Sequence, residues 1–122
     1  MAANKIYTDN FSEFLSDFSD NSAWMKMKFE EIAQVLRLLK ARYPGIDINE
    51  SLEICMTHGM NHISKAKLLI ESLKPLFMTA NEKLDDEGIK ELQLILSYFI
   101  DIAKKTLNGE IARSTLDVAE NI

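Results

Sequence analysis

The feature that most constrains this chain is a repetition of apolar residues in steps of three and four. Such steps bring apolar side chains to one face of an α-helix, whereas a half-buried strand alternates at every second residue. The clearest repetition lies between residues 49 and 77, where eight positions keep the pattern: Leu52, Met56, Gly59, Ile63, Ala66, Ile70, Leu73 and Phe77. Only four glycines and two prolines interrupt the 122 residues. The sequence therefore predicts an all-α protein with a long helix over residues 49–77.

Two further stretches carry the same pattern. The first spans residues 22–43, and Pro44 should end it because proline lacks an N–H donor and disfavours helical geometry in the residue before it. Its apolar positions are Met25, Phe29, Ile32, Leu36, Leu39 and Tyr43, widened by Val35 and Leu38. The third starts at a cap, Asp85 or Asp86, and its broad apolar face consists of Ile89, Leu92, Ile95, Leu96, Phe99, Ile102 and Ala103.

Local sequence predicts where the middle helix begins and ends. Asn49 is the candidate N-cap, since a side-chain oxygen there can accept a free backbone N–H. Pro75 should kink this helix or end it one turn earlier, because it removes one backbone hydrogen bond. We expect the polar residues 80–86 to form a turn.

These segments predict one small helical bundle. Residues 1–21 form an acidic, Phe-rich N-terminal segment, residues 22–109 the bundle core, and residues 110–122 a short C-terminal helix or tail. Three long helices bury their faces best in a bundle of four or more, so either the short flanking helical segments or a second chain should complete it. We favour a homodimer, with a hairpin of residues 49–108 at its core and residues 22–43 packed across it.

Charge and composition exclude several classes of protein. With 14 Lys and Arg against 19 Asp and Glu the net charge is −5, which disfavours nucleic-acid binding because a polyanion is repelled on average. The single cysteine, Cys55, permits no intrachain disulfide and favours a cytoplasmic location. We find no secretory signal and no run of 18 apolar residues, so no membrane association is expected.

The candidate chemistry is confined to eight residues of the predicted middle helix, which hold Cys55, His58 and His62. His58 and His62 are four residues apart, a spacing that lets two imidazoles face one metal ion or lets one ligate haem. No third ligand is evident, and Cys55 lies about 10 Å from His62 along a helix axis. The alternative interpretation is ordinary packing, with His62 at the edge of the apolar face and His58 in solvent. We expect no enzyme activity and no cofactor.

Partner-binding residues are expected where methionine and aromatic side chains lie away from the best apolar face. The flexible thioethers of methionine adapt to varied partners. Trp24 lies at the start of the first predicted helix, where it either belongs to a contact patch or covers the end of the core. In the acidic N-terminal segment, the phenylalanines share one side and suit docking into the chain's own bundle or into a partner's groove. The predicted set is Phe11, Phe14, Phe18, Trp24, Met27 and Met60.

In size and composition the chain resembles the small acidic helical proteins of bacteria that serve as secretion chaperones, immunity proteins, toxin antagonists or phage-encoded inhibitors. No motif accompanies this likeness. From the helical faces and the absence of catalytic motifs we predict a non-enzymatic protein-interaction module, an adaptor, chaperone-like protein or inhibitor, that acts as a homodimer on an unidentified protein client. The alternative function is a metal or haem sensor that uses His58 and His62.

Overall fold

The computed structural model describes residues 23–106 and 109–122, which are helical and contain no strand. The prediction of an all-α fold is therefore confirmed. A helix over residues 23–42 is followed by α2 (Asn49–Met56), α3 (His62–Met78), α4 (Ala80–Lys83), α5 (Asp86–Thr106) and α6 (Gly109–Ala119). The predicted contact residues Phe11, Phe14 and Phe18 lie outside the described residues.

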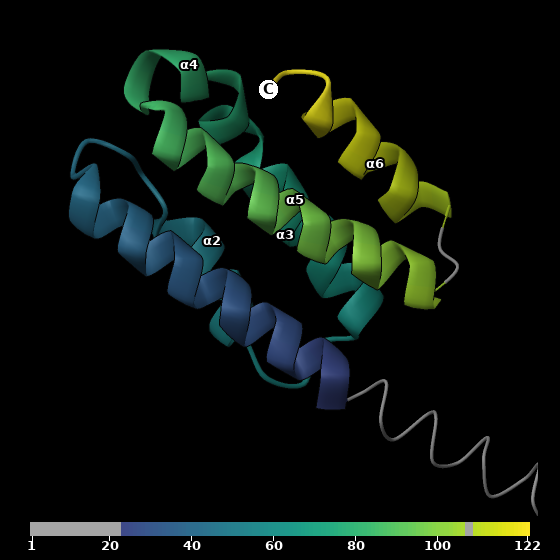
Figure 1. Ribbon diagram of the computed structural model, residues 1–122. Helices are drawn as coiled ribbons and strands as arrows, with labels where there is room; N and C mark the ends of the chain where they lie inside the picture. The colour runs from purple at the N-terminus through teal and green to yellow at the C-terminus, as the bar shows by residue number, and fades with distance from the viewer. Residues whose placement is uncertain (1–22, 107–108) are drawn as a thin grey trace, which may run out of the picture.

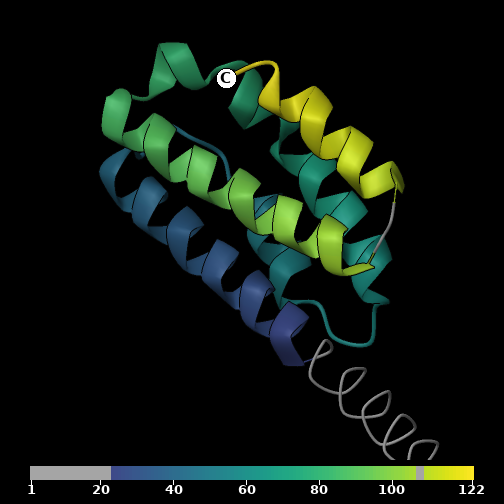
Figure 2. The same ribbon diagram turned by 45° about the vertical axis from the view of Figure 1, so that its right-hand side comes forward.

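The helices are arranged in two layers (Figure 1). The 23–42 helix, α5 and α6 lie side by side in one layer, with α5 between the other two, and α2 and α3 lie behind them (Figure 2). Helix α3 contacts α2, α5 and α6. The carboxyl terminus lies beside α4, at the end of the molecule opposite residue 23 (Figure 1). The two layers enclose one core.

The apolar faces predicted from the sequence meet in that core. Phe29, Phe77 and Phe99 are each at most 1% exposed, and aliphatic side chains surround them. Helix α6 adds Ile111 and Val118 to the same cluster. Leu38 was expected to widen the buried face of the first helix, but it is 59% exposed because it points away from the core.

The predicted middle helix is two helices, α2 and α3, separated by residues 57–61. The expectation of one continuous helix is therefore wrong. After α2 ends at Met56, Thr57 is extended and Gly59 adopts φ +79°, a left-handed conformation that a continuous α-helix does not contain. Asn61 then caps α3, since its Oδ1 accepts the backbone N–H groups of Ile63 at 2.9 Å and Ser64 at 3.3 Å. The break leaves Met56, a predicted core residue, at the end of α2 and 56% exposed.

The start of α2 differs from the prediction as well. Asn49 is the first residue of this helix rather than its cap, which is Ile48. The side chain that accepts a free N–H is that of Asp47, whose Oδ1 lies 3.2 Å from the backbone nitrogen of Asn49. The side-chain oxygen at the start of this helix therefore belongs to Asp47 and not to the predicted cap, Asn49.

Pro75 does not end α3, which continues to Met78. Burial explains this difference, because Leu76 and Phe77 are only 6% and 1% exposed and their packing outweighs one missing hydrogen bond. Within the predicted turn, residues 80–83 form the single-turn helix α4.

The predicted cap of the third long helix is confirmed at Asp85. Its Oδ1 accepts the backbone N–H of Gly88 at 3.0 Å, and Tyr43 donates its hydroxyl hydrogen to the same oxygen. The hydrogen bond from Tyr43 and that from Gly88 hold the pKa of Asp85 below its usual value. This cap links the end of the 23–42 helix to the start of α5.

Candidate functional site

The chemically versatile side chains of this protein line a pocket of about 240 Å³ beside the α2–α3 loop. Its walls come from the 23–42 helix, the end of α2, the loop and the first turn of α3. The lining residues are Lys26, Glu30, Cys55, Met56, Thr57, His58, Gly59, Met60, His62 and Lys65. We call this the loop pocket. The break between α2 and α3 creates it, because a continuous helix would have no loop there.

Lys65 is the most constrained charged group in the loop pocket. It is 8% exposed, its Nζ donates a hydrogen bond to the carbonyl oxygen of Thr57 at 3.0 Å, and it lies 4.8 Å from the centroid of the Phe29 ring. Burial lowers the pKa of Lys65, and the charge of Lys26 lowers it further. Lys65 therefore ties the loop to α3 and places positive charge at the pocket wall.

His62 and His58 line the loop pocket from different elements. His62 is the first residue of α3 and stacks on Phe29, with 6.0 Å between ring centroids and 16° between planes. His58 is exposed in the loop. The expected geometry, two histidines one turn apart on a single helix, is wrong because the helix breaks between them. Burial, followed by the charge of Lys65, lowers the pKa of His62, so its imidazole is neutral at pH 7.

Cys55 contributes a protonated thiol to the pocket. Its side chain is 7% exposed, and burial raises its pKa to about 11. A thiol is a nucleophile or metal ligand only after it loses its proton, so this group is inert at neutral pH. Within residues 23–106 and 109–122, no three His, Cys, Asp or Glu side chains gather closely enough to hold a metal ion.

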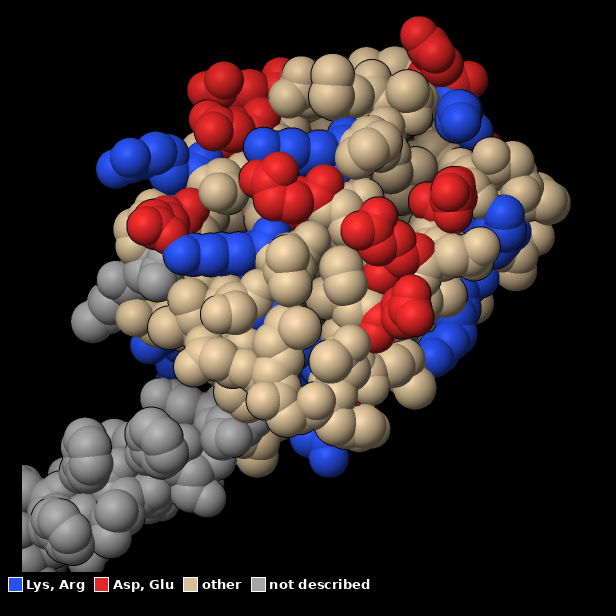
Figure 3. Space-filling model, turned by 180° about the vertical axis from the view of Figure 1, so that it is seen from behind, with Lys and Arg blue, Asp and Glu red and all other residues tan. Residues whose placement is uncertain are grey.

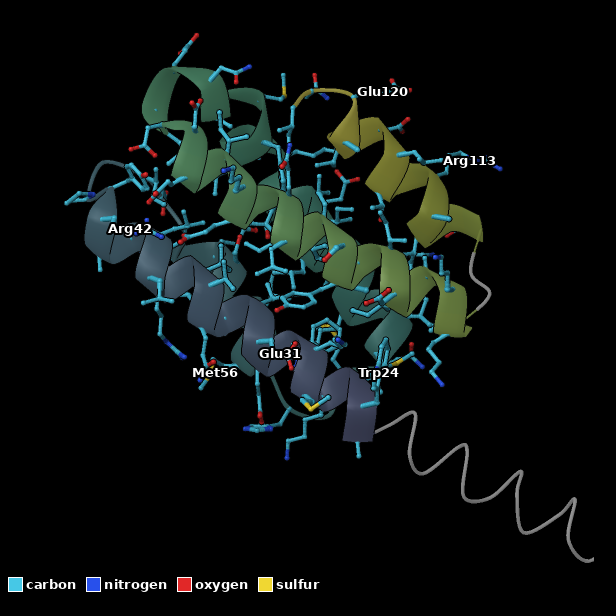
Figure 4. The ribbon with its side chains drawn as sticks, in the orientation of Figure 1. Trp24, Glu31, Arg42, Met56, Arg113 and Glu120 are labelled. Carbon is cyan, nitrogen blue, oxygen red and sulfur yellow. The ribbon has the colours of Figure 1, made fainter. Side chains whose placement is uncertain are left out.

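A second surface spans the neighbouring 23–42 helix and α5, and we call it the α5 face. Across it, residues of the first helix contact residues of α5: Trp24, Lys28, Glu31 and Arg42 on the first helix, and Glu87, Glu91, Tyr98, Asp101 and Lys105 on α5. Steps of three and four along each helix place Val35, Leu38 and Leu94 on the same face. Trp24 and Arg42 lie at opposite ends of the first helix, with Glu31 between them (Figure 4).

Charged groups pair at both ends of the α5 face. At one end Arg42 forms ion pairs with Glu87, at 3.4 Å, and with Glu91. At the other end Lys28 lies 4.0 Å from Asp101. Ion pairs at a protein surface contribute little stability, but each cation offsets one acidic charge: Arg42 offsets one of the two carboxylates at its end, and Lys28 offsets Asp101.

The centre of the α5 face is apolar. Leu38 is 59% exposed and Leu94 is 43% exposed, and the half-buried Val35 and Tyr98 accompany them. Sequence reasoning missed Leu94 and treated Leu38 as part of the core. Positions 24, 28, 31, 35, 38 and 42 themselves follow steps of four and three, but their mixed polarity hid this second stripe.

The predicted contact residues within the described part of the chain do not lie on one surface. Trp24 lies on the α5 face, half-buried against the core, with the ammonium groups of Lys28 and Lys105 at 5.1 Å and 5.9 Å from its ring centroid. Met60 lines the loop pocket, and Met27 is 45% exposed. The predicted contact set contains one member of each surface, and the predicted chemical cluster Cys55, His58 and His62 lies in the loop pocket. Nothing in the sequence indicated Lys26, Glu30 and Lys65, whose place in the pocket depends on the loop.

Comparison with protein-family models, with curated proteins and with solved structures gives no match for this chain. Among the helices of the described residues, none has the length and apolar content needed to cross a bilayer.

Proposed function

We propose that this protein is a non-enzymatic protein-interaction module that acts as a helical homodimer on a protein client, as an adaptor, a chaperone-like protein or an antagonist. The observation that carries the proposal is the centre of the α5 face, where Leu38 and Leu94 are 59% and 43% exposed. An apolar centre within a polar rim is the usual arrangement of a protein–protein interface.

Charge supports a second copy of this chain as the occupant of the α5 face. Two copies that each carry a net charge of −5 repel one another on average. On the α5 face, however, the acidic groups Glu91 and Asp101 are paired with Arg42 and Lys28 of the same chain. A twofold axis through the centre would place the leucines of both copies together, so that one patch serves as both halves of the interface.

The chemistry of the loop pocket supports the non-enzymatic part of the proposal. Its thiol, Cys55, has a pKa of about 11, and the ammonium group of Lys65 is engaged with a backbone carbonyl. Neither group is poised as a nucleophile or base at neutral pH.

Sedimentation equilibrium of the untagged protein tests the homodimer. We expect the wild type to be a dimer and the double variant Leu38→Glu with Leu94→Glu to be a monomer, because like charges would face each other across the twofold axis. The matched control is Leu68→Glu with Leu116→Glu, which changes leucines that are 48% and 61% exposed elsewhere. The control should stay dimeric. A monomeric wild type, or a dimeric double variant, contradicts the proposal.

The second candidate function is a metal or haem sensor. The observation that favours it is that His58 and His62 line one pocket with Met60. Native mass spectrometry of protein purified without chelator distinguishes the two functions. A metal-free dimer supports the interaction module, whereas a mass excess that disappears in the variant His58→Ala with His62→Ala supports the sensor.

A further inference from the structure

The loop pocket has apolar and positively charged walls. Met56 and Met60 supply flexible thioethers, which make favourable contacts with aromatic rings. Lys26 and Lys65 supply two positive charges against the single negative charge of Glu30. A cavity of about 150 Å³ is large enough for benzene, so a pocket of about 240 Å³ has room for a phenylalanine ring. The pocket therefore suits an aromatic side chain from an acidic segment.

The same chain contains such a segment. Residues 1–22 carry one lysine and four acidic residues, and the phenylalanines among them are Phe11, Phe14 and Phe18. Phe14 and Phe18 are four residues apart, a spacing that puts both rings on one side of a helical segment. The charge and the side chains of this segment complement those of the loop pocket.

The distance along the chain is short enough for docking. The pocket lies along the first two turns of the 23–42 helix, because Lys26 and Glu30 are about 4.5 Å and 10.5 Å from residue 23 along the helix axis. Residues 19–22 span up to about 13 Å when extended. Their sequence, Ser-Asp-Asn-Ser, is typical of turns. A turn there lets Phe14 and Phe18 reach the pocket.

The surface next to residue 23 also favours an acidic occupant. Figure 3 shows acidic and basic side chains interspersed over the upper and middle parts of this face, whereas its lowest part is mostly uncharged with basic side chains at the edge. Lys26 is exposed and lines the loop pocket on the helix that follows the acidic segment.

We propose that residues 11–18 dock in the loop pocket of the same chain, with Phe14 or Phe18 against Met56 and Met60 and with acidic side chains toward Lys26. This inference does not rest on the homodimer, because the loop pocket and the α5 face are different surfaces.

Methionine methyl NMR of the full chain tests the docking. In the variant Phe14→Ala with Phe18→Ala, the resonances of Met56 and Met60 should move because they lose the ring-current shift of the docked ring. The resonance of Met78, which is 67% exposed at the end of α3, should not move. The matched control, Ser12→Ala with Ser16→Ala, should leave all these resonances in place.

Alkylation of Cys55 by an uncharged reagent at alkaline pH, where more of the thiol is ionised, provides a second measurement, since this pocket residue is the chain's only cysteine. The double phenylalanine variant should react about tenfold faster, which corresponds to a change of about 1.4 kcal/mol in the docking equilibrium. Lys26→Glu should also increase the alkylation rate, because it repels the acidic segment. The direct effect of losing a positive charge is the opposite, since it favours the protonated, less reactive thiol. Lys90→Glu, an equal charge change at an exposed position of α5, should leave the rate unchanged.

Two results would overturn the inference. One is that the double phenylalanine variant and the wild type have the same Met56 and Met60 resonances and the same alkylation rate. The other is protection of Cys55 that increases with protein concentration, because the occupant would then be the segment of a second copy.

Discussion

His62 and Lys65 show how single residues acquire their properties from the break in the helical pattern. Both side chains lie against the ring of Phe29 on the neighbouring helix. Burial in this position lowers the pKa of each, because a charged form loses water there. The sequence placed His62 at the edge of an apolar face, but it contained no indication that Lys65 would contact Thr57.

The lowered pKa of His62 predicts that acid destabilises the fold. Its folded-state pKa lies below the ordinary value of 6.5, so as pH falls through that value the unfolded chain binds the proton first and stability decreases. In His62→Gln, the loss of unfolding free energy between about pH 7.5 and pH 5.5 should be smaller than in the wild type. Urea unfolding at the two pH values measures it.

His58→Gln is the matched control for this prediction, because it removes an exposed histidine from the same pocket. This variant should retain the full acid-dependent loss of the wild type. An equal loss in His62→Gln and the wild type would contradict the prediction.

At the scale of elements, the interruption between α2 and α3 decides the shape of the candidate site. The sequence placed Gly59 among the repeated positions on the apolar face of the predicted middle helix. The structure instead uses its backbone freedom, since φ is +79° and a Cβ atom there would meet no atom within 4 Å. Glycine is therefore required at this position for its backbone conformation and not because a larger side chain would lack space.

Gly59→Ala should consequently destabilise the protein by about 1 to 2 kcal/mol, the cost of left-handed geometry for a residue with a Cβ atom. Gly45→Ala is the matched control, because a Cβ atom there also meets nothing within 4 Å and its φ is not positive. The control should lose much less stability in urea unfolding. Equal losses in the two variants would show that the left-handed conformation is not the cause.

At the scale of the whole molecule, α6 is packed into the same core as the long helices. It contacts both α3 and α5, and Ile111 and Val118 are 0% and 1% exposed. An ion pair between Lys67 of α3 and Glu110 of α6 supports this contact at the surface. Residues from the last part of the chain therefore close the bundle on the side of α5 opposite the 23–42 helix (Figure 1).

Ile111→Ala should lower the free energy of unfolding by about 2 to 5 kcal/mol, because it removes buried methyl groups and leaves a cavity. Leu116→Ala, on the same helix but at a position that is 61% exposed, should change it by about 0.5 kcal/mol or less. Thermal or urea unfolding of both variants provides the measurement. Similar small losses would indicate that α6 unfolds separately from the core.

The sequence by itself determined the helical class, most of the buried faces and a cap at Asp85 or Asp86, of which the structure uses Asp85. These features follow from local geometry, since 3.6 residues per turn relate the spacing of apolar residues directly to one helix face. The same reasoning placed Met60 and Trp24 among the candidate contact residues, and the structure gives each of them a place on one of the two surfaces.

Only the tertiary structure decided that residues 57–61 interrupt the middle helix and that two helix faces form the α5 face. The interruption depends on the packing of α2 back against α3, including a 2.8 Å hydrogen bond between the hydroxyl groups of Ser51 and Ser72. Such contacts join residues far apart in sequence, and their free energy outweighs the continuous apolar pattern. A local repeat specifies which side chains share a helix face, but it does not specify where the backbone turns back.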